Sequence, residues 1–188
     1  MTSQRYIALI RGINVGRAKR VAMADLRKLI DELGYRDVRS VLNSGNLVFT
    51  ADGLDPAVAA AAIEEQMVLK FGVAARVMVL SGEELAAVLA ENTLLSQATD
   101  HARLLVFILG DVAVRPALAP LGERSWSPEA LALGQRAVYV WCPESVLSSA
   151  AASALGKQLG DNTTSRNWNT LCKLYALCNE PASVPPGA

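Results

Sequence analysis

The first half of the chain alternates between short unbroken apolar runs and longer stretches in which every third or fourth residue is apolar. The short runs predict buried strands, and the spaced apolar residues predict amphipathic helices. Residues 5–80 therefore have the predicted order βαββαβ, which is that of a ferredoxin-like split βαβ unit. The predicted strands are 6–10, 38–42, 46–50 and 75–80, and the predicted helices are 26–33 and 56–72.

Local signals support the helices of this half. Asp55 is a capping residue, Pro56 suits the first helical position, and Gly72 is a typical helix end. Ser81 and Glu84 have the spacing of a capping box, which predicts one more helix directly after the last strand.

The second half repeats this order less regularly, so we expect an α+β fold of two ferredoxin-like (βαββαβ) halves in tandem, related by duplication. The predicted joint is the polar stretch 92–101, between an N-terminal half at 1–95 and a C-terminal half at 102–180, with a loose tail at 181–188. The predicted elements of the second half are a strand at 104–109, a short helix at 117–121, a hairpin of 130–133 with 137–141, a helix at 146–159, a strand at 163–166 and a final helix from Trp168.

Composition narrows the class of protein. Of 188 residues 52% are hydrophobic, and 18 basic residues balance 18 acidic ones, which excludes a disordered chain or one that coats nucleic acid by bulk charge. Three cysteines and one histidine favour a reduced protein without a structural zinc site. The longest aliphatic run, 104–109, is too short for a membrane span, and no signal-peptide core is evident. We expect a cytoplasmic protein with no metal, no cofactor and no membrane partner.

The one local charge imbalance lies near the start, where residues 5–28 hold seven basic residues and one acidic residue. Four of the basic residues fall in the loop between the first predicted strand and helix. Two glycines there let backbone N–H groups turn toward a ligand, and the helix N-terminus that follows favours an anion. The loop predicts a phosphate or carboxylate cradle, although a solvated basic loop explains the same charges. Its candidate residues are Arg11, Asn14, Gly16, Lys19 and Arg20.

Two further polar clusters stand out. Residues 43–46, which include Asn46, lie between two predicted strands, where a plain turn explains them. Residues 164–170 open the last helix, where Ser165 or Asn167 would cap it and Trp168 would pack on the core. Capping does not account for the whole cluster, so Arg166 with its amide and indole neighbours also predicts an anion- or base-recognition corner.

Catalytic groups are only weakly indicated. His101 in the polar joint is typical of an exposed histidine, and Cys142 at the end of an apolar strand is typical of a buried structural thiol. The glutamate pairs at 64–65 and 83–84 fit solvated helix faces or caps.

Several segments together resemble the bacterial domain-of-unknown-function family 1697, over about residues 5–178. The segments that carry the resemblance are Tyr6–Gly16, Met23–Arg27, Ser44–Phe49, Thr164–Thr170 and Lys173-Leu174. The resemblance implies a cytoplasmic α+β protein of two related halves with no established activity. The chain departs from the family pattern at Arg17, where a second glycine is usual, at Ala22, where a proline is usual, and at Ser149, where a lysine is usual. If that lysine contacts a ligand in relatives, this chain lacks the contact.

The leading hypothesis is a non-catalytic binding protein for a phosphate-bearing ligand, a nucleotide or a short nucleic acid, at the joint between the halves. The loops would supply charge and hydrogen bonds, because binding residues concentrate in loops. The alternatives are a small transferase or hydrolase with an Arg/Asn anion site, and a self-associating or partner-binding module. The predicted site residues are Arg11, Asn14, Gly16, Lys19, Arg20, Asn46, Arg166, Asn167, Trp168 and Lys173.

Overall fold

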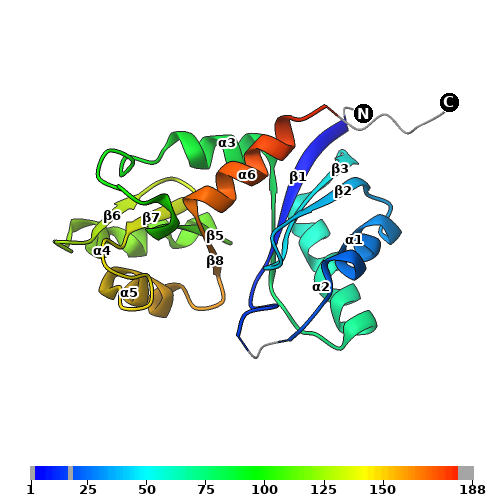
Figure 1. The fold of residues 1–188 in the computed structure, drawn as a ribbon, viewed down its shortest axis with the longest axis horizontal. Coiled ribbons are helices and arrows are strands. Elements are labelled where there is room, and N and C mark those ends of the chain that lie inside the picture. The colour runs from blue at the N-terminus through cyan, green and yellow to red at the C-terminus, as the bar shows by residue number, and fades with distance from the viewer. Residues whose placement is uncertain (1–2, 17–18, 182–188) are drawn as a thin grey trace. The chain divides into compact units, whose positions relative to one another are not determined.

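The computed structural model describes residues 3–16 and 19–181 (Figure 1). Arg17 of the basic loop and the predicted tail from residue 182 onward lie outside the described residues. The chain divides into two compact units, which we call unit 1, Met1–Glu84 with Lys173–Ala188, and unit 2, Leu85–Cys172. The division falls inside helix α3 (Gly82–Ala90) and inside helix α6 (Trp168–Asn179), whereas the sequence places the joint at 92–101.

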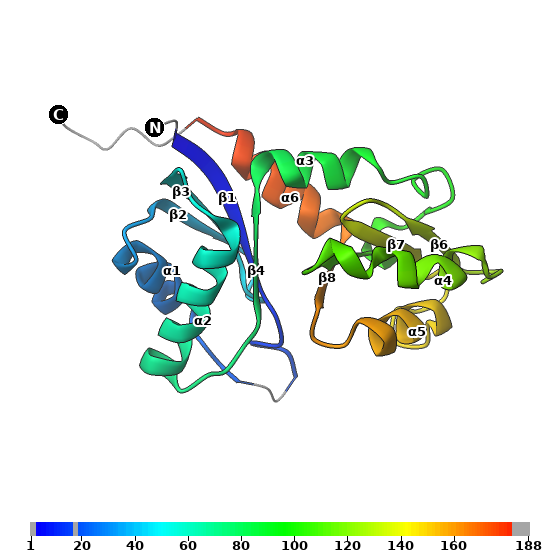
Figure 2. The same ribbon diagram turned by 180° about the vertical axis from the view of Figure 1, so that it is seen from behind.

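Unit 1 has the predicted βαββαβ order and an antiparallel sheet with strand order β2-β3-β1-β4. Helices α1 and α2 lie on the same face of this sheet in both ribbon views (Figure 2). The elements are β1 (Ser3–Ile10), α1 (Met23–Glu32), β2 (Arg36–Val41), β3 (Asn46–Asp52), α2 (Pro56–Phe71) and β4 (Val77–Ser81).

The predicted capping signals of unit 1 are confirmed by hydrogen bonds. The Asp55 carboxylate accepts from the backbone N–H groups of Ala57 and Val58, and Gly72 ends α2 in the left-handed region at φ 64°. At the start of α3, Ser81 N–H donates to Glu84 Oε2 over 2.8 Å while Glu84 N–H donates to Ser81 Oγ over 3.1 Å. This reciprocal pair is the capping box expected from the spacing.

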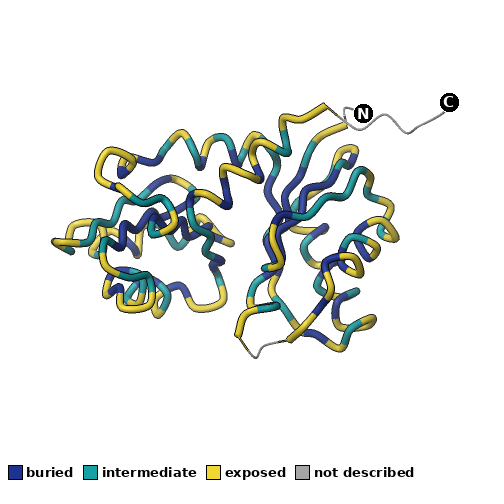
Figure 3. Tube along the Cα trace, in the orientation of Figure 1, coloured by how far each residue is buried: buried dark blue, intermediate teal, exposed yellow. Residues whose placement is uncertain are grey.

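The core of unit 1 forms between the sheet and the apolar faces of α1 and α2. Alternate residues of β1, among them Ala8 and Ile10, pack against Leu26 and Ile30 of α1 and Ile63 of α2. Buried positions follow the strands in Figure 3, and exposed positions follow the loops and outer helix faces. Each Å² of apolar surface removed from water stabilises the fold by about 25 cal/mol, so the buried side chains of this sheet–helix interface stabilise the unit.

Unit 2 repeats the arrangement, with an antiparallel sheet of strand order β6-β7-β5-β8 and a core of its own under α5. The fold-class prediction of two ferredoxin-like halves is therefore confirmed. The elements are η1 (His101–Arg103), β5 (Leu104–Leu109), η2 (Val112–Leu118), α4 (Ala119–Glu123), β6 (Ala130–Leu133), β7 (Ala137–Trp141), α5 (Ala150–Leu159) and β8 (Thr163–Asn167).

Two helices of unit 2 differ from the prediction. The short helix expected at 117–121 is a 3-10 helix, η2, that continues into α4. The helix expected from residue 146 begins at Ala150, because Ser149 adopts an extended backbone and its hydroxyl accepts from Ala152 N–H. A cap at Ser149 stops the helix from extending toward residue 146.

Each unit makes an equivalent pair of backbone hydrogen bonds at the end of its first strand. In unit 1, Ile10 N–H donates to Gly45 O and Arg11 N–H to Arg76 O, each over 2.8 Å. In unit 2, Leu109 N–H donates to Arg136 O and Gly110 N–H to Asn162 O, each over 2.9 Å. Both sheets therefore close in the same way at this end, and the connections that follow can be compared directly.

Candidate functional site

The Asn14 side chain bonds to residues on both sides of the described part of the basic loop of unit 1. Its side-chain Nδ2 donates to Val21 O over 2.7 Å and to Asn43 O over 2.8 Å, and its Oδ1 accepts from Val21 N–H over 2.8 Å. Its backbone has φ 55°, in the left-handed region that asparagine tolerates. Since both Nδ2 hydrogens are engaged, the side chain ties the loop to itself and to the turn before β3, and so acts by positioning the loop.

Ile13 and Gly45 allow this loop to pack against the core of unit 1. Ile13 is completely buried, and Gly45 has φ 79°. A Cβ on Gly45 would lie 2.9 Å from Ile10 Cβ, closer than Cβ atoms approach in folded proteins, and 3.1 Å from Ile13 Cδ1, a tight contact. Two polar segments that the sequence suggested separately, the basic loop and residues 43–46, therefore meet at one end of unit 1.

Asn46 belongs to the interior of the turn. Its side chain is buried, and its Nδ2 donates to Val41 O over 3.1 Å and to Ser44 Oγ over 3.0 Å. These contacts satisfy its two N–H groups within the turn, so they support the structural interpretation of residues 43–46.

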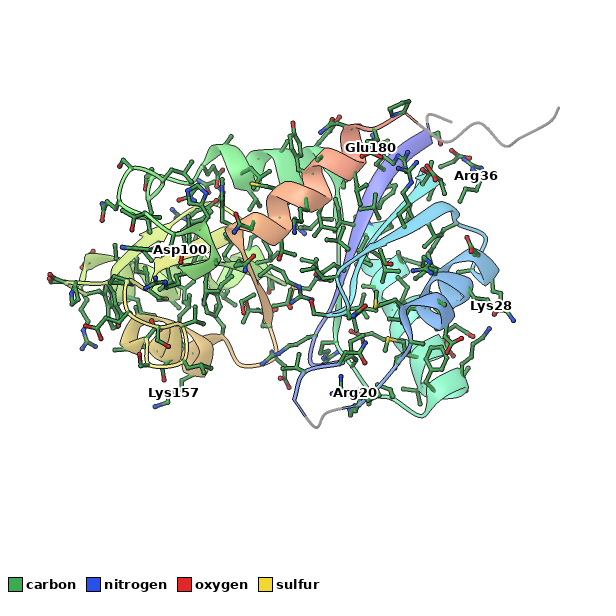
Figure 4. All side chains as sticks on the ribbon, in the orientation of Figure 1. Arg20, Lys28, Arg36, Asp100, Lys157 and Glu180 are labelled. Atoms are coloured by element: carbon green, nitrogen blue, oxygen red, sulfur yellow. The ribbon has the colours of Figure 1, made fainter. Side chains whose placement is uncertain are left out.

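The cations of the basic loop bond to neutral backbone oxygens. The Arg20 guanidinium donates to Gly16 O over 2.8 Å and to Asn14 O over 3.5 Å, and Lys19 Nζ donates to Ala74 O. Both side chains belong to exposed residues. Carbonyl partners orient these groups but leave their positive charge in place. In Figure 4, Arg20 lies at the opposite end of the unit 1 sheet from Arg36.

Arg11 is the third charged residue predicted for the site in this loop, and it is half-buried. Gly16, later in the same loop, has φ 57°, a left-handed conformation that glycine adopts without steric cost. Arg11, Asn14, Gly16, Lys19 and Arg20 thus lie in one loop, and Asn46, the first residue of β3, lies at the same end of unit 1.

The predicted corner in unit 2 contains one partly buried cation. Arg166 Nη1 donates to Thr164 Oγ1 over 2.9 Å and to Ser165 O over 2.8 Å. Burial lowers the pKa of the Arg166 guanidinium to about 10, so the group remains charged at neutral pH.

The neighbours of Arg166 have structural contacts of their own. Asn167 Oδ1 accepts from both the N–H and the hydroxyl of Thr170, which makes it the side-chain cap of α6. Trp168 is buried and meets His101 edge to face, with ring centroids 6.5 Å apart. Lys173 is exposed on the part of α6 that belongs to unit 1. A shared site at the joint between the halves stays a prediction.

The cysteines are protonated thiols at neutral pH. Burial raises the pKa of Cys142, of Cys172 and, to about 11, of Cys178. Thiols are much weaker nucleophiles than thiolates, so these raised pKa values are not those of activated cysteines. Within residues 3–16 and 19–181, no three His, Cys, Asp or Glu side chains gather as a metal-ligand set. Every helix of that same part of the chain is too short or too polar to cross a lipid bilayer.

Two polar groups of the structure were not recognised in the sequence. Glu129 accepts from Ser149 Oγ over 2.5 Å and from the N–H groups of Ala150 and Ala151 at the start of α5. Arg5, one of the seven basic residues near the N-terminus, lines a cavity beside α3. No short motif marks either group, because their partners lie twenty or more residues away along the chain.

Comparison with known proteins identifies a family and a similar solved structure. The family model described as a protein of unknown function (DUF1697) matches residues 3–139. The solved structure of the conserved bacterial protein SP0830 from Streptococcus pneumoniae is similar over 94% of this chain and 99% of that chain, with 28% identity and a TM-score of 0.76. No curated protein matches the chain.

Proposed function

The chain belongs to the DUF1697 family of proteins of unknown function, and we propose that it binds a phosphate-bearing ligand, a nucleotide or a short nucleic acid, through the basic loop of unit 1. The observation that carries this proposal is that Lys19 and Arg20 bond to neutral carbonyl groups in a loop whose backbone is held by Asn14. Such cations keep their charge for a ligand.

The contacts at the two ends of the loop support binding. A flexible segment loses conformational entropy when a ligand orders it, whereas residues 13, 14 and 21 are already held by burial of Ile13 and the hydrogen bonds of Asn14. In the proposal, Asn14 and Asn46 position the loop, and the charged side chains contact the ligand.

The N-terminus of α1 also provides an electrostatic field that favours an anion. Its N-cap is Ala22, whose methyl group cannot accept a hydrogen bond from the first helical turn. Unpaired N–H groups at a helix N-terminus favour an anion, and α1 begins directly after the basic loop. Arg166 of unit 2 is a further cation in the proposal, and it is tested by a variant of its own.

The test is calorimetric titration of the protein with AMP and with an eight-nucleotide single-stranded DNA, at low and at high salt. We expect binding that weakens with salt, and about a tenfold loss of affinity for Lys19→Gln or Arg20→Gln, because each removes one charged contact. Lys28→Gln, an exposed lysine on α1 of the same unit, is the matched control and should bind as the wild type does.

The outcomes are distinct. Absence of heat with both ligands at low salt contradicts the proposal, and so does wild-type affinity in the Lys19→Gln/Arg20→Gln double variant. If Arg166→Gln also weakens binding about tenfold, both units contribute to the ligand site. If only the unit 1 variants do, the basic loop acts alone.

One observation favours a partner-binding module as a second function. Val15 and Leu42, next to the Asn14–Asn43 contact, are 60% and 54% exposed. Leu42 also has φ 58°, which is strained for a leucine. Leu42→Asn should relieve the strain, because asparagine tolerates this backbone region. If the module interpretation holds, the wild type will self-associate in concentration-dependent light scattering and Leu42→Asn will not.

A further inference from the structure

Strand β6 forms one edge of the unit 2 sheet and pairs with β7 (Figure 1). Its sequence, Ala-Leu-Ala-Leu, contains no charged residue and no proline. An edge strand presents backbone N–H and C=O groups that can pair with a further strand, and proteins usually block such edges with charges, bulges or covering groups. The edges of the two sheets differ in whether they carry a block of this kind.

The edge strand β4 of unit 1 is blocked by carboxylates. Val77 N–H donates to Glu64 Oε1 and Ser81 N–H donates to Glu84 Oε2, each over 2.8 Å. Both N–H groups are donors that a further strand would need, and both are already used within the unit. A second strand therefore has little to bond to along β4.

The remaining two edge strands carry other blocks. In β2 the register with β3 shifts between Arg36 and Arg39, and Asp37 has a left-handed φ of 48°. This bulge and its charged residues interrupt the edge. In β8 the Ser165 carbonyl accepts from Arg166 Nη1 over 2.8 Å. Three of the four edge strands therefore have a charged side chain on the edge or an irregular backbone, and β6 has neither.

The two leucines of β6 carry the backbone groups that face outward. Gly134 N–H donates to Ala137 O over 2.8 Å, so the β6–β7 hairpin closes on a hydrogen-bonded pair. Hydrogen-bonded and non-hydrogen-bonded pairs alternate along an antiparallel ladder, which puts Leu131 and Leu133 in non-hydrogen-bonded pairs. Their N–H and C=O groups point away from β7, and they have no hydrogen bond within the part of the chain that the structure describes.

The position of this edge is already fixed by packing. Leu131 and Leu133 contact the core of unit 2 with their side chains, and Ala130 and Ala132 face the other side of the sheet. All four residues are half-buried, as expected for a strand with one side open to solvent. A strand that is already ordered loses little conformational entropy when it pairs.

We propose that β6 pairs with β6 of a second copy of this chain, as antiparallel strands related by a two-fold axis through Ala132. In this register Leu131 of each copy lies opposite Leu133 of the partner subunit. The pair forms four hydrogen bonds and satisfies every outward N–H and C=O group of the two leucines. The two sheets then join into one sheet of eight strands across the dimer.

A second copy fits this edge because the strand is self-complementary. In a symmetric antiparallel pair, residues on the same face of the sheet lie opposite each other, so Ala132 meets Ala132 of the partner subunit. Two methyl groups leave the strands free to approach, and no charges repel. An axis through Leu131 would instead require the N–H of Glu129, which already donates to Trp126 O over 2.9 Å.

The first test is cross-linking of the full chain with Cys172→Ser, which removes the exposed native thiol. Ala132→Cys places two thiols in a non-hydrogen-bonded pair, with Cα atoms about 4.5 Å apart, within reach of a disulfide. Ala130→Cys, on the same face of the same strand, is the matched control, because its two copies lie about 13 Å apart in this register. Under mild oxidation we expect a disulfide-linked dimer from Ala132→Cys and monomer from Ala130→Cys.

The second test measures mass by sedimentation over about a hundredfold range of protein concentration, because four hydrogen bonds make a weak dimer. We expect the average mass of the wild type to rise toward twice that of the monomer. Ala132→Glu and Ala132→Lys should each weaken association at least about tenfold, because like charges then lie opposite each other. An equimolar mixture of the two should associate again. Ala61→Glu, at an exposed position of α2, is the control and should associate as the wild type does.

The outcomes separate this interface from the surface beside Leu42. Leu42→Asn should leave association through β6 unchanged. Association that is lost in Leu42→Asn but kept in Ala132→Glu overturns the proposal, and so does a wild type that stays monomeric at every concentration. Equal cross-linking of Ala132→Cys and Ala130→Cys also contradicts it. If Ala132→Glu does not fold by circular dichroism, the cross-linking pair decides the proposal by itself.

Discussion

The two units close their sheets with the same backbone hydrogen bonds and then continue in different ways. After β1, twelve residues lead to α1, and they include Lys19, Arg20 and the left-handed Asn14. After β5, only two residues lead to η2, and the second of them, Asp111, caps it by accepting from Ala113 N–H over 2.8 Å.

The difference shows that the long connection is not needed for the fold. Unit 2 makes the same strand order with two residues where unit 1 uses twelve. Each residue of such a connection that is ordered costs conformational entropy, of the order of 1 kcal/mol. Ile13 and Asn14 offset part of that cost by burial and hydrogen bonding. Because unit 2 forms the same strand order without such a segment, the long connection of unit 1 is where function is expected.

The N-termini of α5 and α1 also differ between the two units, because only α5 has side-chain partners for its first N–H groups. In unit 2, α5 begins at a hydroxyl cap, Ser149, and its first N–H groups donate to the Glu129 carboxylate. In unit 1, α1 begins after Ala22 with no side-chain cap. Unit 2 therefore supplies its own anion to a helix N-terminus, whereas unit 1 leaves that position for a ligand in the proposal.

The largest expected effect comes from adding a side chain at Gly45, whose carbonyl accepts the hydrogen bond from Ile10 N–H in unit 1. Gly45→Ala places a methyl group 2.9 Å from Ile10 Cβ at φ 79°, so we expect a loss of about 2–4 kcal/mol in the free energy of unfolding. Gly34→Ala is the matched control, with φ 88° and open space around it, and should cost about 1 kcal/mol. Urea-induced unfolding followed by circular dichroism measures both, and equal losses would show that the close approach to Ile10 is unimportant.

The next effect concerns the residue that holds the long loop. Asn14→Ala removes three hydrogen bonds, so we expect a loss of about 2 kcal/mol and faster hydrogen exchange at the Val21 amide. Asp111→Ala removes the cap at the corresponding connection of unit 2 and should cost about 1 kcal/mol. Unchanged exchange at Val21 would contradict the positioning role of Asn14.

A smaller effect, with a defined pH dependence, is expected at Glu129. Its burial tends to raise the pKa, but hydrogen bonds from Ser149, Ala150 and Ala151 outweigh it and hold the pKa below the ordinary value of 4.5. A carboxyl group whose pKa is lowered by folding stabilises the protein above its unfolded pKa and loses this contribution as pH falls through the folded pKa.

Glu129→Gln should therefore cost about 1 kcal/mol at pH 7, and the difference from the wild type should shrink as pH falls below about 4.5. Unfolding curves at pH 7, 5, 4 and 3 measure it. A difference that stays constant over this range would show that the carboxylate charge contributes nothing to the cap.

The smallest effect on stability is expected where the proposed effect on binding is largest. Lys19→Gln and Arg20→Gln change exposed side chains that bond to neutral carbonyls, so each should alter the free energy of unfolding by less than about 0.5 kcal/mol. The same urea experiment measures this. A loss similar to that of Asn14→Ala would show that the cations serve the scaffold of unit 1 and not a ligand.

Predictions from the sequence succeeded where the deciding contacts are short-range. The start of α2 at Asp55 and the capping box of Ser81 with Glu84 depend on residues two or three positions apart, and both are confirmed. The start of α5 was predicted four residues too early, because the apolar pattern extends back to Val146. In the structure, Ser149 and the distant Glu129 fix the first residue of the helix.

The candidate site was predictable in composition but not in the roles of its residues. The basic loop is evident from its charges, yet Asn14 could be assigned equally to a ligand or to the loop itself. Only the positions of Val21 and Asn43 around it show that both of its N–H groups are used within the protein.

The amino-acid pattern by itself determined the order of strands and helices, the duplication, and most helix ends, because periodicity and capping are properties of neighbouring residues. The tertiary structure decided which polar groups share a place. The meeting of the basic loop with residues 43–46, and the cavity around Arg5, bring together residues that lie up to 175 positions apart. Those contacts depend on how the sheet orders its strands, and no local run of side chains records that order.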